Sequence, residues 1–270
     1  MKLRPLSTAI LAAALLLTGF AARAEDRKDI TIGTSVGEFA DMARQGFKPW
    51  LEQRGYKVKV VEFSDYVQPN LALAQGAIDA NIFQHEVYLR KFAADRGLQL
   101  TPIAQVPTAP MGLYSRKHRS LAELADGARI AMPNDPTNQA RALAILAKLG
   151  WVTLKPDVDP VRASEKDVAG NPRKLKLLPL EAAMLPRSLD DTDFSFVNGN
   201  YALSSGLKLS EALKLEDLGE RYINVIAVRT VDLKQPFVAE LRAAARSPEF
   251  KAFVAKRFPG FTQPPEWAKQ

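Results

Sequence analysis

Apolar and polar residues alternate along the chain in a pattern that predicts strands and helices in turn. Residues 29–34 form a short β-branched run, and residues 57–63 alternate apolar and polar positions as a strand does. Between them, apolar residues recur at three- and four-residue steps over 39–51, which is typical of a helix packed on a core. A helix at 68–75 and a strand at 78–83 continue the series. This order predicts a parallel sheet covered by helices.

The same alternation returns in the second half of the chain. Strands are predicted at 111–115, 129–132, 194–197 and 224–228, and a helical stretch at 237–253. Asn134-Asp135-Pro136 offers a capping side chain and a first-turn proline to a helix that ends at Gly150. Residues 152–185, rich in Lys, Asp and Pro, predict no clear element. The whole pattern predicts an α/β protein with two lobes.

The first 24 residues are typical of a secretory signal rather than of a folded element. Lys2 and Arg4 give a positive start, an apolar stretch follows at 9–17, and Ala22-Arg23-Ala24 forms a cleavage site of the A-x-A type. We expect cleavage there, so that the mature chain begins at Glu25. No later stretch approaches the roughly 20 apolar residues that a membrane helix needs.

Composition excludes several classes of chemistry. The 270 residues include no cysteine, so thiolate metal sites, disulfides and cysteine nucleophiles are impossible, and only His85 and His118 remain as histidine ligands. We expect no metal and no cofactor. The signal contains three of the basic residues, so its removal lowers the formal charge from +7 to +4. No stripe of Lys and Arg interleaved with aromatic residues appears, so we expect no nucleic-acid partner.

The end of the signal bears on how the protein is held in its compartment. Leu17-Thr18-Gly19 is similar to the start of a bacterial lipobox, in which the next residue is a cysteine that receives lipid. Phe20 stands at that position and has no thiol. We therefore expect a free periplasmic protein without a lipid anchor.

The sequence Gly33-Thr34-Ser35-Val36-Gly37 matches the G-x-S-x-G pattern of a hydrolase nucleophile at a strand-to-helix turn. A secreted serine hydrolase that uses Ser35 is therefore one hypothesis. Against it, the turn follows the first strand of the mature chain, whereas such hydrolases need earlier strands, one of which supplies an oxyanion-hole amide. The alternative is a turn of small residues that lets helix N-terminal amides face a cleft.

Aromatic residues follow two of the predicted parallel strands, at their carboxyl ends. Tyr66 follows one strand, and Phe83, His85 and Tyr88 follow the next. Open α/β sheets bind ligands at these ends. The four side chains either wall an apolar slot with polar tips or belong to the core.

Polar residues gather at three other predicted element ends. Asn138 and Arg141 lie one helical turn apart behind Asp135, where the guanidinium and the helix N-terminus would suit a carboxylate. A surface arginine beside a structural cap is the alternative. Asn198 and Asn224 are flanked by apolar residues, and a buried amide there needs a partner from a ligand or the backbone.

Six blocks of the chain form a distinctive set, in order between about Ile30 and Arg229. They are Phe63-Ser64-Asp65-Tyr66, Asp79-Ala80-Asn81 with Phe83-Gln84-His85 and Tyr88, Met111-Gly112-Leu113-Tyr114-Ser115, Asn134-Asp135-Pro136-Thr137-Asn138, Leu185-Pro186-Arg187-Ser188-Leu189-Asp190-Asp191, and Asn198-Gly199-Asn200-Tyr201-Ala202. Taken together, these blocks resemble the NlpA/MetQ family of methionine-binding substrate-binding proteins of ABC importers.

The resemblance implies a two-lobed periplasmic-binding-protein fold, similar to type II, with the ligand in the cleft between the lobes. The implied division is a signal peptide at 1–24, a first lobe at 25–112 plus 223–270, and a second lobe at 113–222. The positions that match the family's site are Tyr66, Phe83, His85 and Tyr88 around the thioether side chain, Asn138 and Arg141 near the ligand's backbone groups, and Asn198 and Asn224 at its amino and carboxylate ends.

The function that follows is binding without a chemical step. We expect a monomer that binds L-methionine, or a close analogue such as D-methionine or a methionine-containing dipeptide, and delivers it to an ABC permease. A binding protein for another small anion is a further alternative. The chain departs from the family at Phe20 and at Glu86-Val87, an unusual pair that bears on the shape of the slot.

Overall fold

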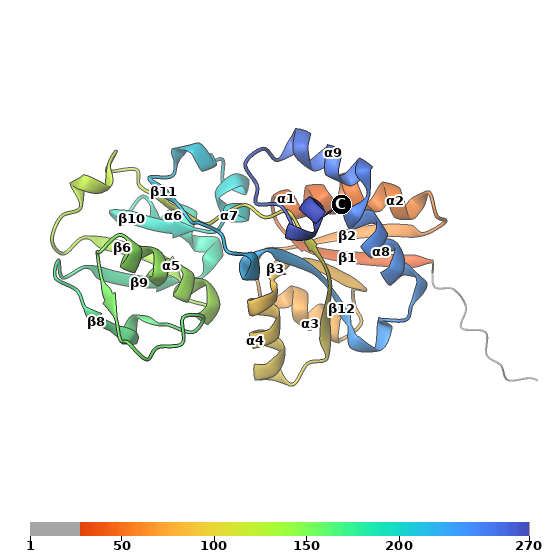
Figure 1. The fold of residues 1–270 in the computed structure, drawn as a ribbon, viewed down its shortest axis with the longest axis horizontal. Helices are drawn as coiled ribbons and strands as arrows, with labels where there is room; N and C mark the ends of the chain where they lie inside the picture. Colours follow the sequence, from red (N-terminus) through yellow and green to blue (C-terminus); the bar gives the residue numbers. More distant parts are fainter. Residues whose placement is uncertain (1–27, 270) are drawn as a thin grey trace, which may run out of the picture.

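The computed structural model describes residues 28–269, so the predicted signal peptide and Phe20 lie outside the described part of the chain. Two five-stranded sheets occupy separate halves of the molecule, and helices cover their faces (Figure 1). The two segments that cross between the halves are residues 107–111 and 216–223. The predicted α/β architecture with two lobes is therefore present.

The first sheet has the strand order β2-β1-β3-β12-β4. Its strands are β1 (Asp29–Ser35), β2 (Lys57–Phe63), β3 (Ala80–His85), β4 (Leu100–Val106) and β12 (Asn224–Arg229). β1 runs parallel to β2 and β3, as the strand–helix alternation predicted, whereas β12 runs antiparallel to both β3 and β4. β12, from late in the chain, thus lies inside a sheet whose other strands come from the first part of the chain.

Helices on both faces bury the apolar residues of this sheet. They are α1 (Glu38–Asp41), the π-helical η1 (Met42–Phe47) and α2 (Lys48–Glu52), which follow one another without a break, then α3 (Gln68–Ala74), α4 (Glu86–Arg96), α8 (Pro236–Arg246) and α9 (Pro248–Arg257). Phe47 and Phe250 meet in this core with ring centroids 4.6 Å apart. Gly55, with φ of 81°, ends the first helical run, because a left-handed residue stops a helix.

The C-terminal helical stretch predicted over 237–253 is two helices. Ser247 has extended backbone angles, and its hydroxyl accepts a hydrogen bond from the Phe250 amide at 3.1 Å, which caps α9. Pro248 follows it, and the residue before a proline is disfavoured in helical conformation. The spacing of apolar residues alone did not predict this break.

The second sheet has the order β11-β5-β10-β6-β9. Its strands are β5 (Gly112–Tyr114), β6 (Arg129–Pro133), β9 (Lys176–Leu180), β10 (Phe194–Val197) and β11 (Lys214–Leu215), and it packs on α5 (Pro136–Lys148), α6 (Leu185–Ser188) and α7 (Gly199–Ser204). A separate pair, β7 (Thr153–Leu154) and β8 (Val168–Gly170), lies in the region that predicted no clear element. Short 3₁₀ turns are η2 (Leu121–Glu123), η3 (Glu165–Asp167), η4 (Ala182–Met184), η5 (Leu209–Glu211), η6 (Glu220–Tyr222), η7 (Thr230–Asp232) and η8 (Pro265–Lys269).

The two lobes lie against each other. The Tyr201 hydroxyl, from α7, donates to the Ser64 carbonyl oxygen at 2.8 Å. Gly37, with φ of 97°, approaches α7 so closely that a Cβ there would lie 2.8 Å from the Asn200 carbonyl oxygen. Glycine is therefore required on conformational and steric grounds at this contact. Within residues 28–269, no helix combines the length and the apolar character needed to cross a membrane.

Candidate functional site

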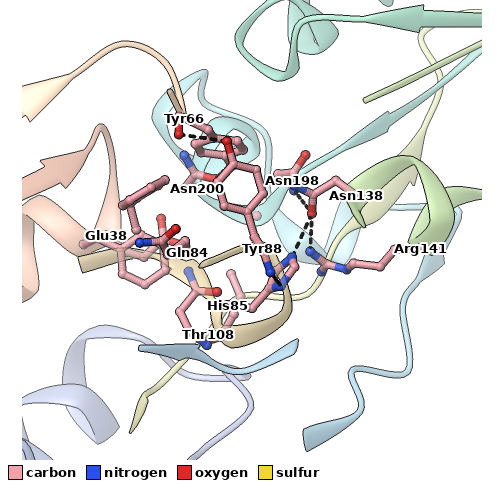
Figure 2. Close-up of a pocket in the computed structure, with 15 residues that line it drawn as sticks. Glu38, Tyr66, Gln84, His85, Tyr88, Thr108, Asn138, Arg141, Asn198 and Asn200 are labelled. Carbon is pink, nitrogen blue, oxygen red and sulfur yellow. Dashed lines mark hydrogen bonds between the residues drawn. The ribbon is translucent and has the colours of Figure 1, made fainter. Parts of the chain in front are cut away.

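One cavity lies between the lobes, and residues from both lobes line it (Figure 2). All eight residues predicted from the sequence line it, namely Tyr66, Phe83, His85, Tyr88, Asn138, Arg141, Asn198 and Asn224. Most of the first four lie on β3 and α4 of the first lobe, whereas Asn138 and Arg141 lie on α5 of the second.

Three aromatic side chains form an apolar wall on the first-lobe side. The ring centroids of Tyr66, Phe83 and Tyr88 lie 5.8–6.1 Å from one another. The Tyr88 hydroxyl donates to the Tyr66 carbonyl oxygen at 2.9 Å, and the Tyr66 hydroxyl donates to Asn200 Oδ1 of the second lobe. Burial raises the pKa of both tyrosines, so both are neutral donors. The wall is therefore fixed in place by hydrogen bonds at its polar tips.

His85 ends β3 and caps the helix that follows. Its Nδ1 accepts a hydrogen bond from the Tyr88 amide at 3.1 Å, so Nδ1 carries no proton. Burial and the nearby Arg141 charge lower the pKa of His85 well below its usual value. The ring is therefore neutral with its proton on Nε2, which lies 3.3 Å from Asn138 Oδ1 and donates to it.

Asn138 is the point where the polar residues of the site meet. Its Oδ1 accepts from His85 Nε2, from Arg141 Nη1 at 2.7 Å and from Asn198 Nδ2 at 3.2 Å. Its own Nδ2 donates to Asp135 Oδ2 at 2.9 Å, and Asp135 also caps α5 through the Asn138 amide. The predicted cap at Asp135 thus orients a side chain of the cavity.

Arg141 is buried and already holds a carboxylate from the protein. Its Nε donates to Glu216 Oε1 at 2.8 Å and its Nη2 donates to Glu216 Oε2, with side chains only 5% and 7% exposed. The Tyr222 ring centroid lies 5.2 Å from the guanidinium carbon. The sequence predicted a carboxylate partner for Arg141 but not Glu216, which occupies the Nε–Nη2 edge of the guanidinium. One N–H on each of Nη1 and Nη2 remains for another acceptor.

Glu216 belongs to a segment that crosses between the lobes. Its amide donates to the Met111 carbonyl oxygen at 2.8 Å, and the Met111 amide lies 3.3 Å from Glu216 Oε2 and donates to it. Met111 belongs to the other crossing segment. The ion pair therefore connects the cavity to both crossing segments at once.

Glu38 also lines the cavity, and its environment differs from that of the other buried charges. The residue is 3% exposed, and neither carboxyl oxygen has a hydrogen-bond partner from another residue among those that the structure describes. Burial raises the pKa of Glu38 to about 8, against the lowering effect of its own backbone amide and with a smaller raising contribution from the Asp41 charge. A buried carboxyl without a donor is costly in its charged form.

The hydrolase hypothesis finds no support in the geometry. Ser35 is fully buried at the end of β1, and its hydroxyl accepts from Asn200 Nδ2 at 3.4 Å. No hydrogen bond joins Ser35 to a histidine in the part of the chain that the structure describes. His85 is committed to Asn138 and Tyr88, and His118 stacks on Phe194 in the second lobe with ring centroids 5.0 Å apart.

Several lining residues were not predicted. The cavity also contains Glu38, Phe39, Gln84, Thr108, Ala109, Gly199 and Asn200. A glutamate after a glycine at a helix start is expected to stabilise the helix dipole at the surface, so nothing in the pattern marked Glu38 as buried. Glu86 and Val87 do not line the cavity, and Glu86 forms an ion pair with Arg90 one turn along α4.

Comparison with known proteins agrees with this architecture. The family model of the NlpA lipoprotein family matches residues 30–267. The chain belongs to the NlpA lipoprotein family.

Relatives in the NlpA family are similar over nearly their whole length. The probable D-methionine-binding lipoprotein MetQ of Vibrio cholerae is 38% identical over 256 residues, which cover 94% of this chain and 95% of the relative. The D-methionine-binding lipoprotein MetQ of Escherichia coli is 38% identical, with 93% of each chain covered. A nutrient binding protein from Burkholderia cenocepacia, solved bound to methionine, is 43% identical with a TM-score of 0.82, covering 86% of this chain and 97% of that one. The predicted family and two-lobed fold are confirmed.

The Arg141–Glu216 pair gives a first prediction. Glu216→Ala leaves a buried guanidinium without its carboxylate, and breaking a buried pair in this way costs about 3 kcal/mol of unfolding free energy. The exposed Lys48–Glu52 pair provides the control, since Glu52→Ala is expected to cost less than about 1 kcal/mol. Urea unfolding followed by circular dichroism measures both, and equal losses in the two variants would contradict the assigned role.

The raised pKa of Glu38 gives a second prediction. Between pH 4.5, the ordinary pKa of the group, and about 8, the folded protein keeps a proton that the unfolded chain releases. Stability is therefore lost as pH rises through this window, by up to about 1.4 kcal/mol per pH unit. Ligand-free Glu38→Gln protein lacks this loss. Melting temperatures of both proteins across the window test it, and parallel pH profiles would refute it.

Proposed function

We propose that this protein is the substrate-binding component of an ABC importer and that its ligand is methionine. The observation that carries the proposal is the cavity: residues predicted from two distant parts of the chain meet around it, in a family member 43% identical to a protein solved with methionine. L-Methionine is the first ligand to test, with D-methionine and a methionine-containing dipeptide as close analogues.

The cavity offers suitable groups for both ends of such a ligand. The remaining N–H groups of Arg141 on Nη1 and Nη2 meet the ligand carboxylate, and the Asn198 and Asn224 amides complete the polar end. The thioether lies against Tyr66, Phe83 and Tyr88, because a flexible, polarisable sulfur chain packs well on aromatic edges. Neutral His85 adds no charge that would compete with the ammonium or the carboxylate.

Binding closes the lobes, and no covalent bond forms or breaks. The contacts that join the lobes, such as Tyr66 with Asn200 and Tyr201 with Ser64, are hydrogen bonds that a closing motion makes and an opening motion breaks. The protein acts as a monomer, has no enzymatic activity and passes its ligand to a methionine-importer permease. A two-state element of this kind is sufficient for capture and delivery.

Thermal stability tests the ligand directly. A ligand that binds only the folded state raises its stability by mass action, by about 2.7 kcal/mol at a concentration one hundred times its Kd. We expect L-methionine to raise the melting temperature, and leucine and glutamate at the same concentration to leave it unchanged. Mass spectrometry of the ligand that co-purifies provides an independent measurement. A protein insensitive to methionine and its analogues would overturn the proposed ligand.

Arg141 is expected to dominate the affinity. Arg141→Ala removes the cationic group that faces the ligand carboxylate and should weaken methionine binding by about 2–4 kcal/mol. Because this change also leaves Glu216 unpaired, the double variant with Glu216→Ala separates ligand binding from folding. Arg116→Ala, at an exposed ion pair with Asp190, is the control. Unchanged affinity of the double variant in titration calorimetry would remove Arg141 from the site.

We further propose that the mature protein is periplasmic and free of lipid, since Phe20 replaces the cysteine that an anchor requires. Expressed with its first 24 residues, the protein should be released by osmotic shock without detergent. Its intact mass should match a chain that begins at Glu25. Partition with membranes together with an added acyl mass would contradict this.

A further inference from the structure

Glu38 is the one carboxyl group among the described residues that line the cavity. Figure 2 shows it on the opposite side of the group of lining residues from Arg141. Glu38 lies where the two lobes meet. It comes directly after Gly37, whose backbone approaches Asn200 of α7 in the second lobe. The approach of the two lobes at this point buries the carboxyl.

The other charged groups near the cavity have partners within the protein. The Arg141 guanidinium is held by the Glu216 carboxylate, and Asp135 accepts from the Asn138 amide and from the Thr137 hydroxyl. No other residue of the described chain donates a hydrogen bond to either oxygen of Glu38. The positive charge of Arg141 is therefore already balanced, and Glu38 is left without compensation.

Unpartnered acceptor atoms belong to residues that line the cavity. Besides the two oxygens of Glu38, Oδ1 of Asn198 is buried and has no donor, although its Nδ2 is bonded to Asn138. Buried polar groups normally find partners, because an unmatched group loses its hydration without replacement. A ligand that brings a cationic donor supplies a partner that these acceptors lack.

We propose that Glu38 accepts the ammonium group of the bound ligand. This inference rests on the proposed function and identifies the counterpart of Arg141: one lobe holds the carboxylate and the other holds the ammonium. The ligand then supplies a partner to a carboxyl that has none from another residue of the closed protein. Burial raises the pKa of Glu38 to about 8, and a bound ammonium would favour its charged form.

Two ligands could supply the ammonium, an amino acid or a dipeptide. They differ in the distance between the ammonium and the carboxylate. In methionine the ammonium is on the carbon next to the carboxylate, whereas in glycyl-methionine it lies one residue farther away. Each ligand has a matched analogue without the amino group: γ-methylthiobutyrate for methionine and N-acetylmethionine for glycyl-methionine. These two pairs isolate the contribution of the ammonium in each case.

The experiment measures the affinities of wild-type and Glu38→Gln proteins for the four compounds by titration calorimetry. Glutamine keeps the size of the side chain and removes its charge. We expect Glu38→Gln to weaken binding of one ammonium ligand at least about tenfold, as for loss of a hydrogen bond between charged groups. Its binding of the matched analogue should equal or exceed that of wild type. Glu52→Gln, the same change at an exposed position of the same helical run, should behave as wild type.

The outcomes are distinct. Loss for methionine assigns the α-ammonium to Glu38, and loss for glycyl-methionine alone assigns the N-terminal ammonium of a dipeptide. Equal affinities for every compound, or equal losses for the ammonium ligands and their analogues, overturn the inference and leave Glu38 a structural residue. The melting temperature of ligand-free Glu38→Gln, expected to be no lower than wild type, controls for folding. Absence of binding by the wild-type protein would instead reject the proposed function itself.

Discussion

The buried pair of Arg141 and Glu216 is the interaction on which the arrangement of the cavity depends. An arginine buried here without a partner would be an uncompensated charge. Glu216 removes that cost and holds the guanidinium in a fixed plane through two parallel hydrogen bonds. Because Glu216 is also bonded to Met111, the orientation of the arginine is coupled to the chain segments that join the lobes.

The rest of the polar site is built outward from this pair. Arg141 donates a hydrogen bond to Asn138 Oδ1, and the same oxygen accepts one from Nε2 of neutral His85 in the other lobe. Burial and the Arg141 charge keep His85 neutral, and its role as a helix cap sets the tautomer, because a protonated Nδ1 could not accept from the Tyr88 amide. Local secondary structure therefore determines which nitrogen of this ring faces Asn138 as a donor.

Sequence patterns predicted the elements and most of the site for reasons that are local. The strand ends that carry Tyr66 and His85 are marked by period and by flanking turn residues, and Asp135 with Pro136 marks the start of α5. The partners of these residues are not local: Glu216 lies 75 positions from Arg141, and no periodicity connects them. Glu38 was not predicted as a cavity residue for a similar reason. Its burial comes from the approach of α7, which lies far along the chain. Pro248 is a sequence signal for the break between α8 and α9. The apolar spacing continues across this break, so the spacing alone predicted one helix.

The position of β12 has a consequence for how the chain reaches this structure. β12 lies between β3 and β4, yet it begins 118 positions after the end of β4 (Val106 to Asn224) and 139 positions after the end of β3 (His85 to Asn224). The second lobe is formed by one continuous stretch and can collapse as soon as that stretch is complete, whereas the first sheet has a gap at its centre until Asn224–Arg229 are available. Long-range pairings of this kind form slowly, because the closure of a large loop precedes any gain from contacts. The first lobe to begin in the sequence is therefore the last to be completed, and during that interval the edges of β3 and β4 are open to pairing with other chains.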